Sequence, residues 1–445
     1  MISRVLTVIG LLSLAVGQWA NAQQIAPVTL TVGEAIAGAE TNQPLIDQAE
    51  GAIRAAEAQV GVSQSGYYPN VSGSASYTRV EPNQAFTFAF PGAPPMTFSL
   101  APEDNYDFHV GLNQVVYQFG VRGVQVKLAR NGVDAARIGL KQIKTSLAYQ
   151  AAQSFYTVLL LEQEVKALDE QLSDLTEHLT AIRKKEQTGS ATVYDVLSTE
   201  VRVAAMKSQR IDAQNQYERQ LIALRQLVGL EPSQPLKVSG SFTPTPVKTP
   251  AQQLVSQALT NRPEMLEAAA SVKTAQLSAQ LAGAQGLPSL SVHALAGFRN
   301  GLLPSINSLT FDWNAGVQLN VPLFQGLLRV KSMEEAQQKL AAAQANLAAE
   351  SRAVTTQVLQ AYQDQKASQD QVETSLVQLN QAEQMVSVAK VQYDVGVVTN
   401  LEYLDSQSSL EQARLTNLMA VFHEVLAEYA LQEAVGDKIW TDASK

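Results

Sequence analysis

The chain contains two copies of one unit. Residues 41–72, TNQPLIDQAEGAIRAAEAQVGVSQSGYYPNVS, align without a gap with residues 260–291, TNRPEMLEAAASVKTAQLSAQLAGAQGLPSLS. The identical residues include Thr41, Asn42, Pro44, Pro69 and Ser72, which fall on Thr260, Asn261, Pro263, Pro288 and Ser291. Further matches pair QVVYQFG (114–120) with NVPLFQG (320–326), and Gly189, Leu197 and Gly229 with Gly396, Leu404 and Gly436. A duplicated sequence is expected to fold as two copies of one supersecondary arrangement, which restricts the fold more than any single motif.

The duplication sets the expected domain organisation. The predicted parts are a first repeat at 23–230, a proline-rich linker at 231–250, a second repeat at 251–437 and a tail at 438–445. Residues 1–22 are typical of a secretory signal peptide, because Arg4 precedes a short apolar core that ends at small residues. We expect cleavage after Ala22 and, since the chain has no cysteine, no lipid on an N-terminal cysteine and no disulfide scaffold.

Each repeat contains two segments in which apolar and polar residues alternate. We expect strands at about 70–80 and 106–117, and at about 289–298 and 311–323. Alternation over about ten residues, with aromatic residues near both ends, is typical of a membrane-spanning strand. A half-buried strand of a soluble sheet fits the same periodicity. The polar excursions between the strands, at 81–105 and 299–310, are expected to be loops.

The remaining residues predict helices. The long ones are expected at about 121–188, 191–229, 326–395 and 399–436, and shorter ones are expected around Pro44 and Pro263. From Val165 to Ile182, apolar residues recur in alternating steps of three and four, which indicates a coiled-coil seam. After Gly189 we expect this seam to continue, first through Leu197, Val201, Ala204, Ser208 and Ile211 and then through Tyr217, Leu221, Leu224 and Val228.

Four strands are too few to close a membrane barrel, because the smallest known ones have about eight. An open strand edge is not tolerated in lipid. If these strands lie in a membrane, several copies of the chain must therefore share one barrel, and the strand count permits two, three or four copies.

Composition excludes several functions. The net charge is −9 and charged residues make up 16%, whereas nucleic-acid binding needs clustered cations. None of the four histidines (His109, His178, His293 and His423) lies at metal-ligand spacing, and no phosphate-binding or dinucleotide-binding glycine run is present. The sequence therefore predicts neither an enzyme nor a cofactor.

The tandem repeats, the four alternating strands and the paired helices broken at VGVVTNLEYLD (395–405) resemble the TolC-type outer-membrane efflux family. The resemblance implies a mostly α-helical homotrimer with twelve strands in one outer-membrane barrel and a periplasmic tunnel of long antiparallel coiled-coil helices. It also implies an exit duct of a tripartite efflux or type I secretion system, served by a periplasmic adaptor and an inner-membrane pump. The exported substrate, whether drug, metal or protein, stays open.

The resemblance also implies site residues. Gly189, Ser190, Gly396, Val397 and Thr399 would form the helix-turn-helix tips at which the adaptor docks. Glu402 and Asp405, six and nine positions after Gly396, would line the pore constriction; position 402 is commonly aspartate in the family. Tyr393 and Asp195 would lock the tips closed, but Val398 stands where an assisting arginine is often found.

Two other classes of protein compete with this interpretation. A periplasmic coiled-coil adaptor also carries helical hairpins, but it should lack four alternating strands with aromatic ends. A trimeric structural stalk should show one continuous heptad run rather than two interrupted copies.

Overall fold

The computed structural model describes residues 28–82, 85–99 and 101–436. The expected signal peptide at 1–22 and the tail at 438–445 lie outside the described residues. None of the helices found in the described ranges has both the length and the apolar character that crossing a membrane requires.

The chain divides into two compact units. The hairpin unit contains the described residues up to Ile46, Ile143–Arg262 and the described residues from Thr355 onward. The sheet unit contains Asp47–Gln142 and Pro263–Val354. Each unit takes elements from both sequence repeats, so the duplication is built into both.

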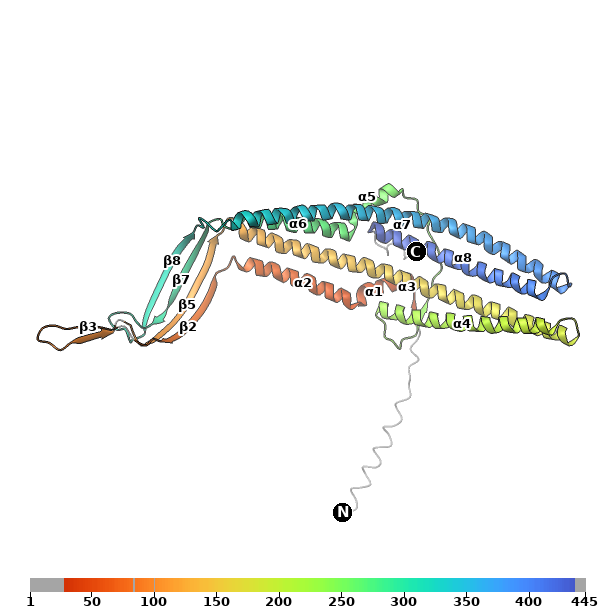
Figure 1. The fold of residues 1–445 in the computed structure, drawn as a ribbon, viewed down its shortest axis with the longest axis horizontal. Coiled ribbons are helices and arrows are strands. Elements are labelled where there is room, and N and C mark those ends of the chain that lie inside the picture. The colour runs from red at the N-terminus through yellow and green to blue at the C-terminus, as the bar shows by residue number, and fades with distance from the viewer. Residues whose placement is uncertain (1–27, 83–84, 100, 437–445) are drawn as a thin grey trace, which may run out of the picture. The chain divides into compact units, whose positions relative to one another are not determined.

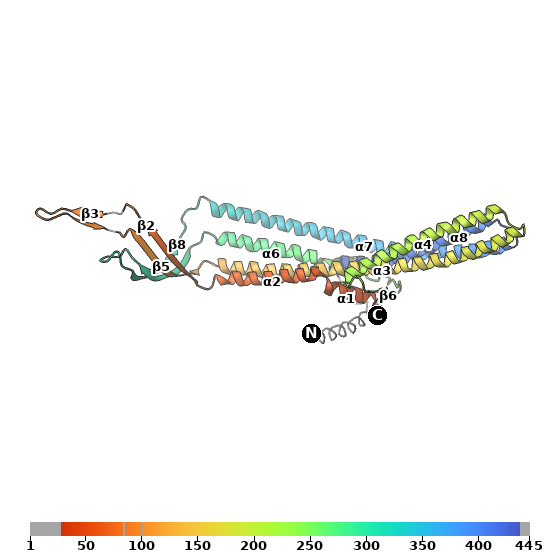
Figure 2. The same cartoon turned by 90° about the horizontal axis from the view of Figure 1, so that it is seen from below.

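The sheet unit is organised around a four-stranded antiparallel sheet of order β2-β5-β7-β8 (Figures 1 and 2). Its strands are β2 (Asn70–Arg79), β5 (Asp104–Tyr117), β7 (Ser289–Arg299) and β8 (Thr310–Asn320). The sheet unit also holds most of α2 (Pro44–Ser65), all of α6 (Pro263–Ala284) and the first parts of α3 and α7. The two repeats thus contribute one hairpin each, β2–β5 and β7–β8, which meet along β5 and β7.

The outer strands of the sheet, β2 and β8, are largely uncovered. Every residue of β2 is exposed, and Trp313 and Val317 of β8 are 69% and 68% exposed. Phe298 and Phe311 are register partners across β7 and β8, and their ring centroids lie 5.5 Å apart. The strands therefore carry the alternation that the sequence predicts, but the apolar side chains lie on a surface rather than in a core.

The sequence predicts only a loop at 81–105, and this prediction is wrong. The segment contains a second hairpin formed by β3 (Ala85–Phe88) and β4 (Met96–Ser99), and the Thr87 and Thr97 hydroxyls lie 3.0 Å apart. Between these strands the chain turns through Pro91 and Gly92, and the latter has a φ of +90°. The Pro-Gly turn between two strand-forming runs was the signal for this hairpin.

Two helical hairpins dominate the other unit, one from each repeat. Their helices are α3 (Val121–Gln187), α4 (Val193–Val228), α7 (Leu328–Asp394) and α8 (Asn400–Val435), of which α3 and α7 begin in the sheet unit. Figures 1 and 2 show α4 returning beside the end of α3, and α8 beside the end of α7. The hairpin unit also contains α1 (Val32–Asn42), α5 (Ala251–Asn261) and a small parallel sheet of β1 (Val28–Leu30) and β6 (Leu236–Val238). The last of these strands lies within the segment that we expected to be a linker.

Only part of the expected coiled-coil seam is buried. On α3, Leu168, Leu175 and Leu179 form a core cluster with residues of α4 and with Leu404 of α8. In the first half of α4 the expected residues are wrong, because Leu197, Val201 and Ile211 are 55%, 68% and 64% exposed. The buried residues there are instead Thr199, Val203, Met206 and Ala213, whereas in the second half Leu221, Leu224 and Val228 are buried as expected. This helix has apolar side chains on two faces, and periodicity alone does not identify which face packs within the chain.

Candidate functional site

The two hairpin turns have the same backbone geometry. After α3, Gly189 N–H donates to the Glu186 carbonyl and Ser190 N–H donates to the Lys185 carbonyl. After α7, Gly396 and Val397 make the corresponding bonds to the carbonyls of Tyr393 and Gln392. This is the Schellman arrangement, in which the glycine takes a left-handed conformation. The φ angles of Gly189 and Gly396, +75° and +79°, explain why glycine stands at both positions.

The helices that follow the turns begin with matching capping boxes. Thr192 and Asp195 cap α4, and Thr399 and Glu402 cap α8, with each hydroxyl accepting from the backbone N–H three residues later. The Glu402 carboxylate accepts from the Thr399 N–H at 2.7 Å and from its hydroxyl at 2.9 Å. These two hydrogen bonds lower the pKa of Glu402 below its usual 4.5, and the bond from the backbone N–H has the larger effect. Glu402 is thus a charged helix cap within the single chain.

A buried amide joins the two hairpins near their tips. Asn400, the first residue of α8, is 4% exposed. Its Nδ2 donates to the Thr199 hydroxyl and to the Asp195 carbonyl, both at 3.3 Å. The amide oxygen is left as the acceptor, and it lies 2.8 Å from Nε2 of His178 in α3. The network therefore assigns the ring proton to Nε2, because only a donor satisfies that oxygen.

Two tyrosines surround the His178 ring. Its centroid lies 5.4 Å from that of Tyr393 and 4.8 Å from that of Tyr403, and the two tyrosine rings stack at 5.6 Å. Burial is the main cause that lowers the pKa of His178 from 6.5, and the hydrogen bond that the ring donates to Asn400 opposes it. The imidazole is therefore held neutral at neutral pH.

An ion pair between α4 and α8 is the second polar link between the hairpins. Arg202 of α4 donates through Nη2 to Asp405 Oδ1 at 2.5 Å and through Nη1 to the Ser408 hydroxyl at 2.6 Å. Both acceptors lie on α8, one turn apart. The Asp405 carboxylate is 61% exposed and the Arg202 side chain is 31% exposed, so the pair lies at the surface of the single chain.

The structure places the expected site residues in one region but does not join all of them. Burial raises the pKa of Tyr393, and the negative charge of Asp195 raises it further. Within residues 28–82, 85–99 and 101–436 no hydrogen bond connects them, because Asp195 Oδ2 bonds to its own cap residue Thr192. Tyr393 instead packs under the Lys185 ammonium, which lies 4.3 Å from the ring centroid.

Sequence reasoning missed three residues of this region: His178, Asn400 and Arg202. The capping boxes were readable, because Thr-x-x-Asp and Thr-x-x-Glu after a glycine are a standard helix-start signature. The partners of Asn400 and Arg202 were not readable. They are about two hundred residues away in the sequence and depend on how the two hairpins pack.

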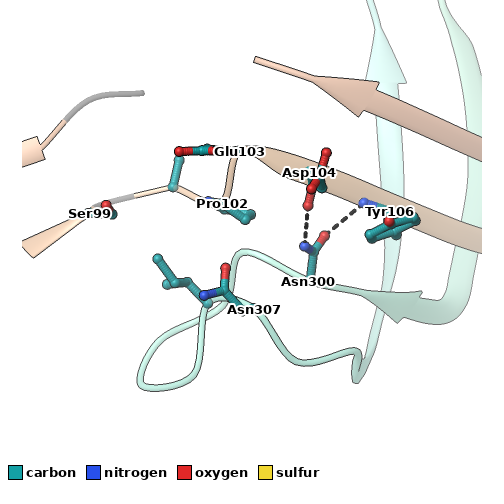
Figure 3. Close-up of a pocket in the computed structure, with 9 residues that line it drawn as sticks. Ser99, Pro102, Glu103, Asp104, Tyr106, Asn300 and Asn307 are labelled. Carbon is teal, nitrogen blue, oxygen red and sulfur yellow. Dashed lines mark hydrogen bonds between the residues drawn. The ribbon is translucent and has the colours of Figure 1, made fainter. Parts of the chain in front are cut away.

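The sheet unit holds a separate hollow of about 390 Å³ beside the first residues of β5 (Figure 3). Asn300 organises its wall by donating to the Asp104 carbonyl at 2.6 Å and accepting from the Tyr106 N–H at 2.8 Å. The lining carboxylates Glu103 and Asp104 are paired with Arg79. No group of three or more potential metal-ligating side chains occurs among the described residues.

Both repeats match a known family. A family model described as outer membrane efflux protein matches residues 35–230 and 254–437. The chain is 26% identical over 332 residues to the pyoverdine export outer membrane protein OpmQ of Pseudomonas putida, covering 71% of this chain and 67% of the relative. It is 21% identical over 415 residues to the outer membrane efflux protein BepC of Brucella suis biovar 1, covering 92% and 86%.

The fold also matches solved structures. The outer membrane channel CmeC of Campylobacter jejuni superimposes with a TM-score of 0.76 at 18% identity, covering 93% of this chain and 87% of that one. The match therefore includes the sheet and the helical hairpins. The chain belongs to the outer membrane efflux protein family, and it is an export channel of the outer membrane that extends into the periplasm.

Proposed function

We propose that three copies of this chain form one exit duct, in which their sheets join into a single closed sheet of twelve strands and their hairpins line a periplasmic tunnel. The observation that carries this proposal is the sheet itself. Its outer strands β2 and β8 are largely uncovered, and large apolar side chains face outward from them. Lipid accepts such side chains but not unpaired backbone groups, so the free edges call for neighbouring copies.

The proposed duct is passive and works with a periplasmic adaptor and an inner-membrane pump. Relatives of the chain are named for pyoverdine export, alkaline protease secretion and cation efflux. These cargoes differ in size and charge, which favours a duct that conducts whatever its pump delivers. The proposal therefore assigns substrate choice to the pump.

The tip turns are the proposed docking points for the adaptor. Gly189, Ser190, Gly396, Val397 and Thr399 form the two turns and the second cap. Apolar side chains stand exposed around them, since Val193, Val395 and Val397 are 61%, 71% and 70% exposed. Exposed apolar groups of this kind are typical of an interaction surface.

The proposed constriction consists of Glu402 and Asp405 from each copy. Both belong to the first two turns of α8. In the assembled duct three copies of each carboxylate would lie close together, where mutual repulsion would raise the pKa of Glu402 and both rings would attract cations. Within one chain the Thr399 bonds act on Glu402 in the opposite direction.

The closed state is proposed to depend on Tyr393 and Asp195. The two residues belong to one contact network, because Asn400 bonds to the Asp195 carbonyl and to His178, whose ring packs against Tyr393. This supports the role, although Asp195 also caps α4. Opening would then require the α7–α8 hairpin to move against the α3–α4 hairpin.

Photo-crosslinking in cells tests the docking proposal. Probes at Ser190 and Val397 should capture one adaptor protein, whereas a control probe at exposed Ala342 of α7 should not. If both tip probes capture nothing while the protein is abundant in the outer membrane, docking at the tips is wrong.

A further inference from the structure

Two acidic residues that look equivalent in the sequence have different partners in the structure. Within the part of the chain that the structure describes, Glu402 bonds to neutral donors of its own cap residue, Thr399, and to no cation. Asp405 instead pairs with a cation, Arg202, from the other hairpin. We propose that Arg202 is a specificity-determining residue of the export channel, which offsets the charge of Asp405 and leaves Glu402 as the main source of negative charge at the constriction. This inference rests on the proposed function of Glu402 and Asp405.

The geometry favours arginine at position 202. Its two terminal nitrogens bond to acceptors one turn apart on α8, Asp405 at 2.5 Å and Ser408 at 2.6 Å. A planar guanidinium offers two donors in a fixed fork, whereas a lysine ammonium is a single point of charge. Arg202 also sits between Thr199 and Val203, both buried, which fixes where its stem leaves α4.

The ion pair changes the field that a permeating ion meets. A carboxylate with a guanidinium at hydrogen-bond distance attracts a distant cation much less than a free carboxylate does, because the two charges nearly cancel. In a trimer, three such pairs would replace three bare charges. The channel should therefore prefer cations less strongly than the two acids alone would indicate.

Reversal potentials in planar lipid bilayers test the inference with the full-length protein and potassium chloride gradients. Arg202→Gln should raise the cation-to-anion permeability ratio at least about twofold, because it frees Asp405. Asp405→Asn should lower the ratio, because it frees Arg202. The double variant should return close to wild type, since it removes a pair that is nearly neutral.

Two further variants separate this role from general charge or folding effects. Arg202→Lys keeps the charge, so its permeability ratio should lie between that of the wild type and that of Arg202→Gln. Arg210→Gln removes the same charge from the same helix, but Arg210 pairs with Asp169 of α3 at 2.9 Å. Its permeability ratio should equal that of the wild type.

The outcomes distinguish the inference from the function on which it rests. If the wild type conducts and Arg202→Gln leaves its ratio unchanged, or if Arg210→Gln shifts the ratio equally, the role of Arg202 is wrong and the channel stands. If the double variant departs from wild type as far as either single variant does, the two residues do not act as a pair. If the wild type conducts without any preference for cations over anions, the proposed constriction and the inference both fall.

Discussion

The amide oxygen of Asn400 lies 2.8 Å from Nε2 of His178, and this contact joins the second helical hairpin of the chain to the first. The same amide donates to Thr199, which is fully buried, so residues of α3, α4 and α8 meet at one side chain. Asn400 and Thr199 are buried, and the Asn400 amide uses both its donor and its acceptor in these contacts. Loss of Asn400 would remove the acceptor of the His178 Nε2–H and the link between the two hairpins, so we expect this residue to control the tip.

Replacement of Asn400 should loosen the tip. Asn400→Ala removes the partner of the His178 Nε2–H and should cost about 1–3 kcal/mol in the stability of the closed hairpin pair. Single-channel recording should show a higher open probability. The control is Asn417→Ala on the same helix, because Asn417 accepts from Ser375 of α7, a contact within the α7–α8 hairpin. Equal open probabilities in the two variants would argue against control by Asn400.

The tip should also weaken in acid through His178. The pKa of His178 is lowered from 6.5, mainly by burial of the ring. The unfolded or opened state therefore binds a proton more readily than the closed state. The contribution of the neutral ring is therefore fully present above about pH 6.5 and is lost as the pH falls through that value toward the lower pKa of the closed state. Charged groups facing the ring act in both directions: Lys185 and Lys390 lower the pKa, and Asp394 raises it.

Hydrogen exchange measures this pH dependence. Amide protection at the start of α8 should fall between about pH 7.5 and 5, after correction for the intrinsic exchange rate. His178→Gln keeps a neutral donor and should show a flatter profile. An identical loss of protection in wild type and His178→Gln would exclude His178 as the titrating group.

The tip glycines are needed for backbone conformation rather than for space. A Cβ at Gly396 would meet no atom within 4 Å, but its φ is +79°. Gly396→Val should therefore destabilise the turn by about 1–2 kcal/mol. Gly51→Ala, in the interior of α2 and also without a neighbour within 4 Å, should instead stabilise the chain by about 0.5–1 kcal/mol. Melting temperatures in detergent should move in opposite directions for the two variants, and a shift in the same direction would contradict this account.

The sheet needs a glycine for a different reason. His109 of β5 reaches across Gly297 of β7 to Asp312 of β8, and its other ring nitrogen bonds to Asp107. A Cβ at Gly297 would lie 2.0 Å from the Phe108 carbonyl oxygen and 2.7 Å from His109 Cα. The close approach of backbone and ring leaves no room for any side chain.

Gly297→Ala should therefore prevent normal assembly of the sheet. The expected result is strong depletion of the protein from the outer-membrane fraction, measured by quantitative immunoblotting. Gly73→Ala in β2 makes the same change where nothing lies within 4 Å, so its level should match wild type. Normal levels of Gly297→Ala would show that β5 and β7 are spaced differently.

The sequence predicted the fold class because each main element has a local signal. The alternation of Phe311, Trp313 and Val317 requires a strand, and the absence of proline between Val121 and Thr188 permits one long helix. The first half of the α4 seam was wrong because Leu197 and Val201 have the expected spacing but lie on an uncovered face. In the trimer that we propose, such a face is available to a neighbouring copy, and spacing does not distinguish contacts within a chain from contacts between chains.

The candidate site was only partly predictable. Gly189 and Gly396 could be identified because a left-handed turn restricts the residue type. Arg202 could not, because its link to Asp405 depends on the packing of two hairpins whose sequences contain no signal for each other.

Joining of the sheet edges is the central claim, and disulfide trapping tests it directly. Gly111 of β5 pairs with Ser72 of β2, and the equivalent residues of the second repeat, Gln318 and Ser291, pair in the same way. Between the repeats, Gly111 also pairs with Leu295 of β7. Ser76 is the first-repeat equivalent of Leu295, because each lies four residues after its paired serine, Ser72 or Ser291. If the register between the repeats also holds between copies, Ser76 of one chain lies opposite Gln318 of the next.

The wild-type chain has no cysteine, so the trap has no background. Oxidation of the Ser76→Cys, Gln318→Cys double variant in outer membranes should give a covalently closed trimer on denaturing gels, and each single variant should stay monomeric. As a register control, Ser76→Cys with Val317→Cys, which faces the other side of the strand, should crosslink poorly. A double variant that stays monomeric, or that forms only dimers, would contradict the shared sheet of three copies.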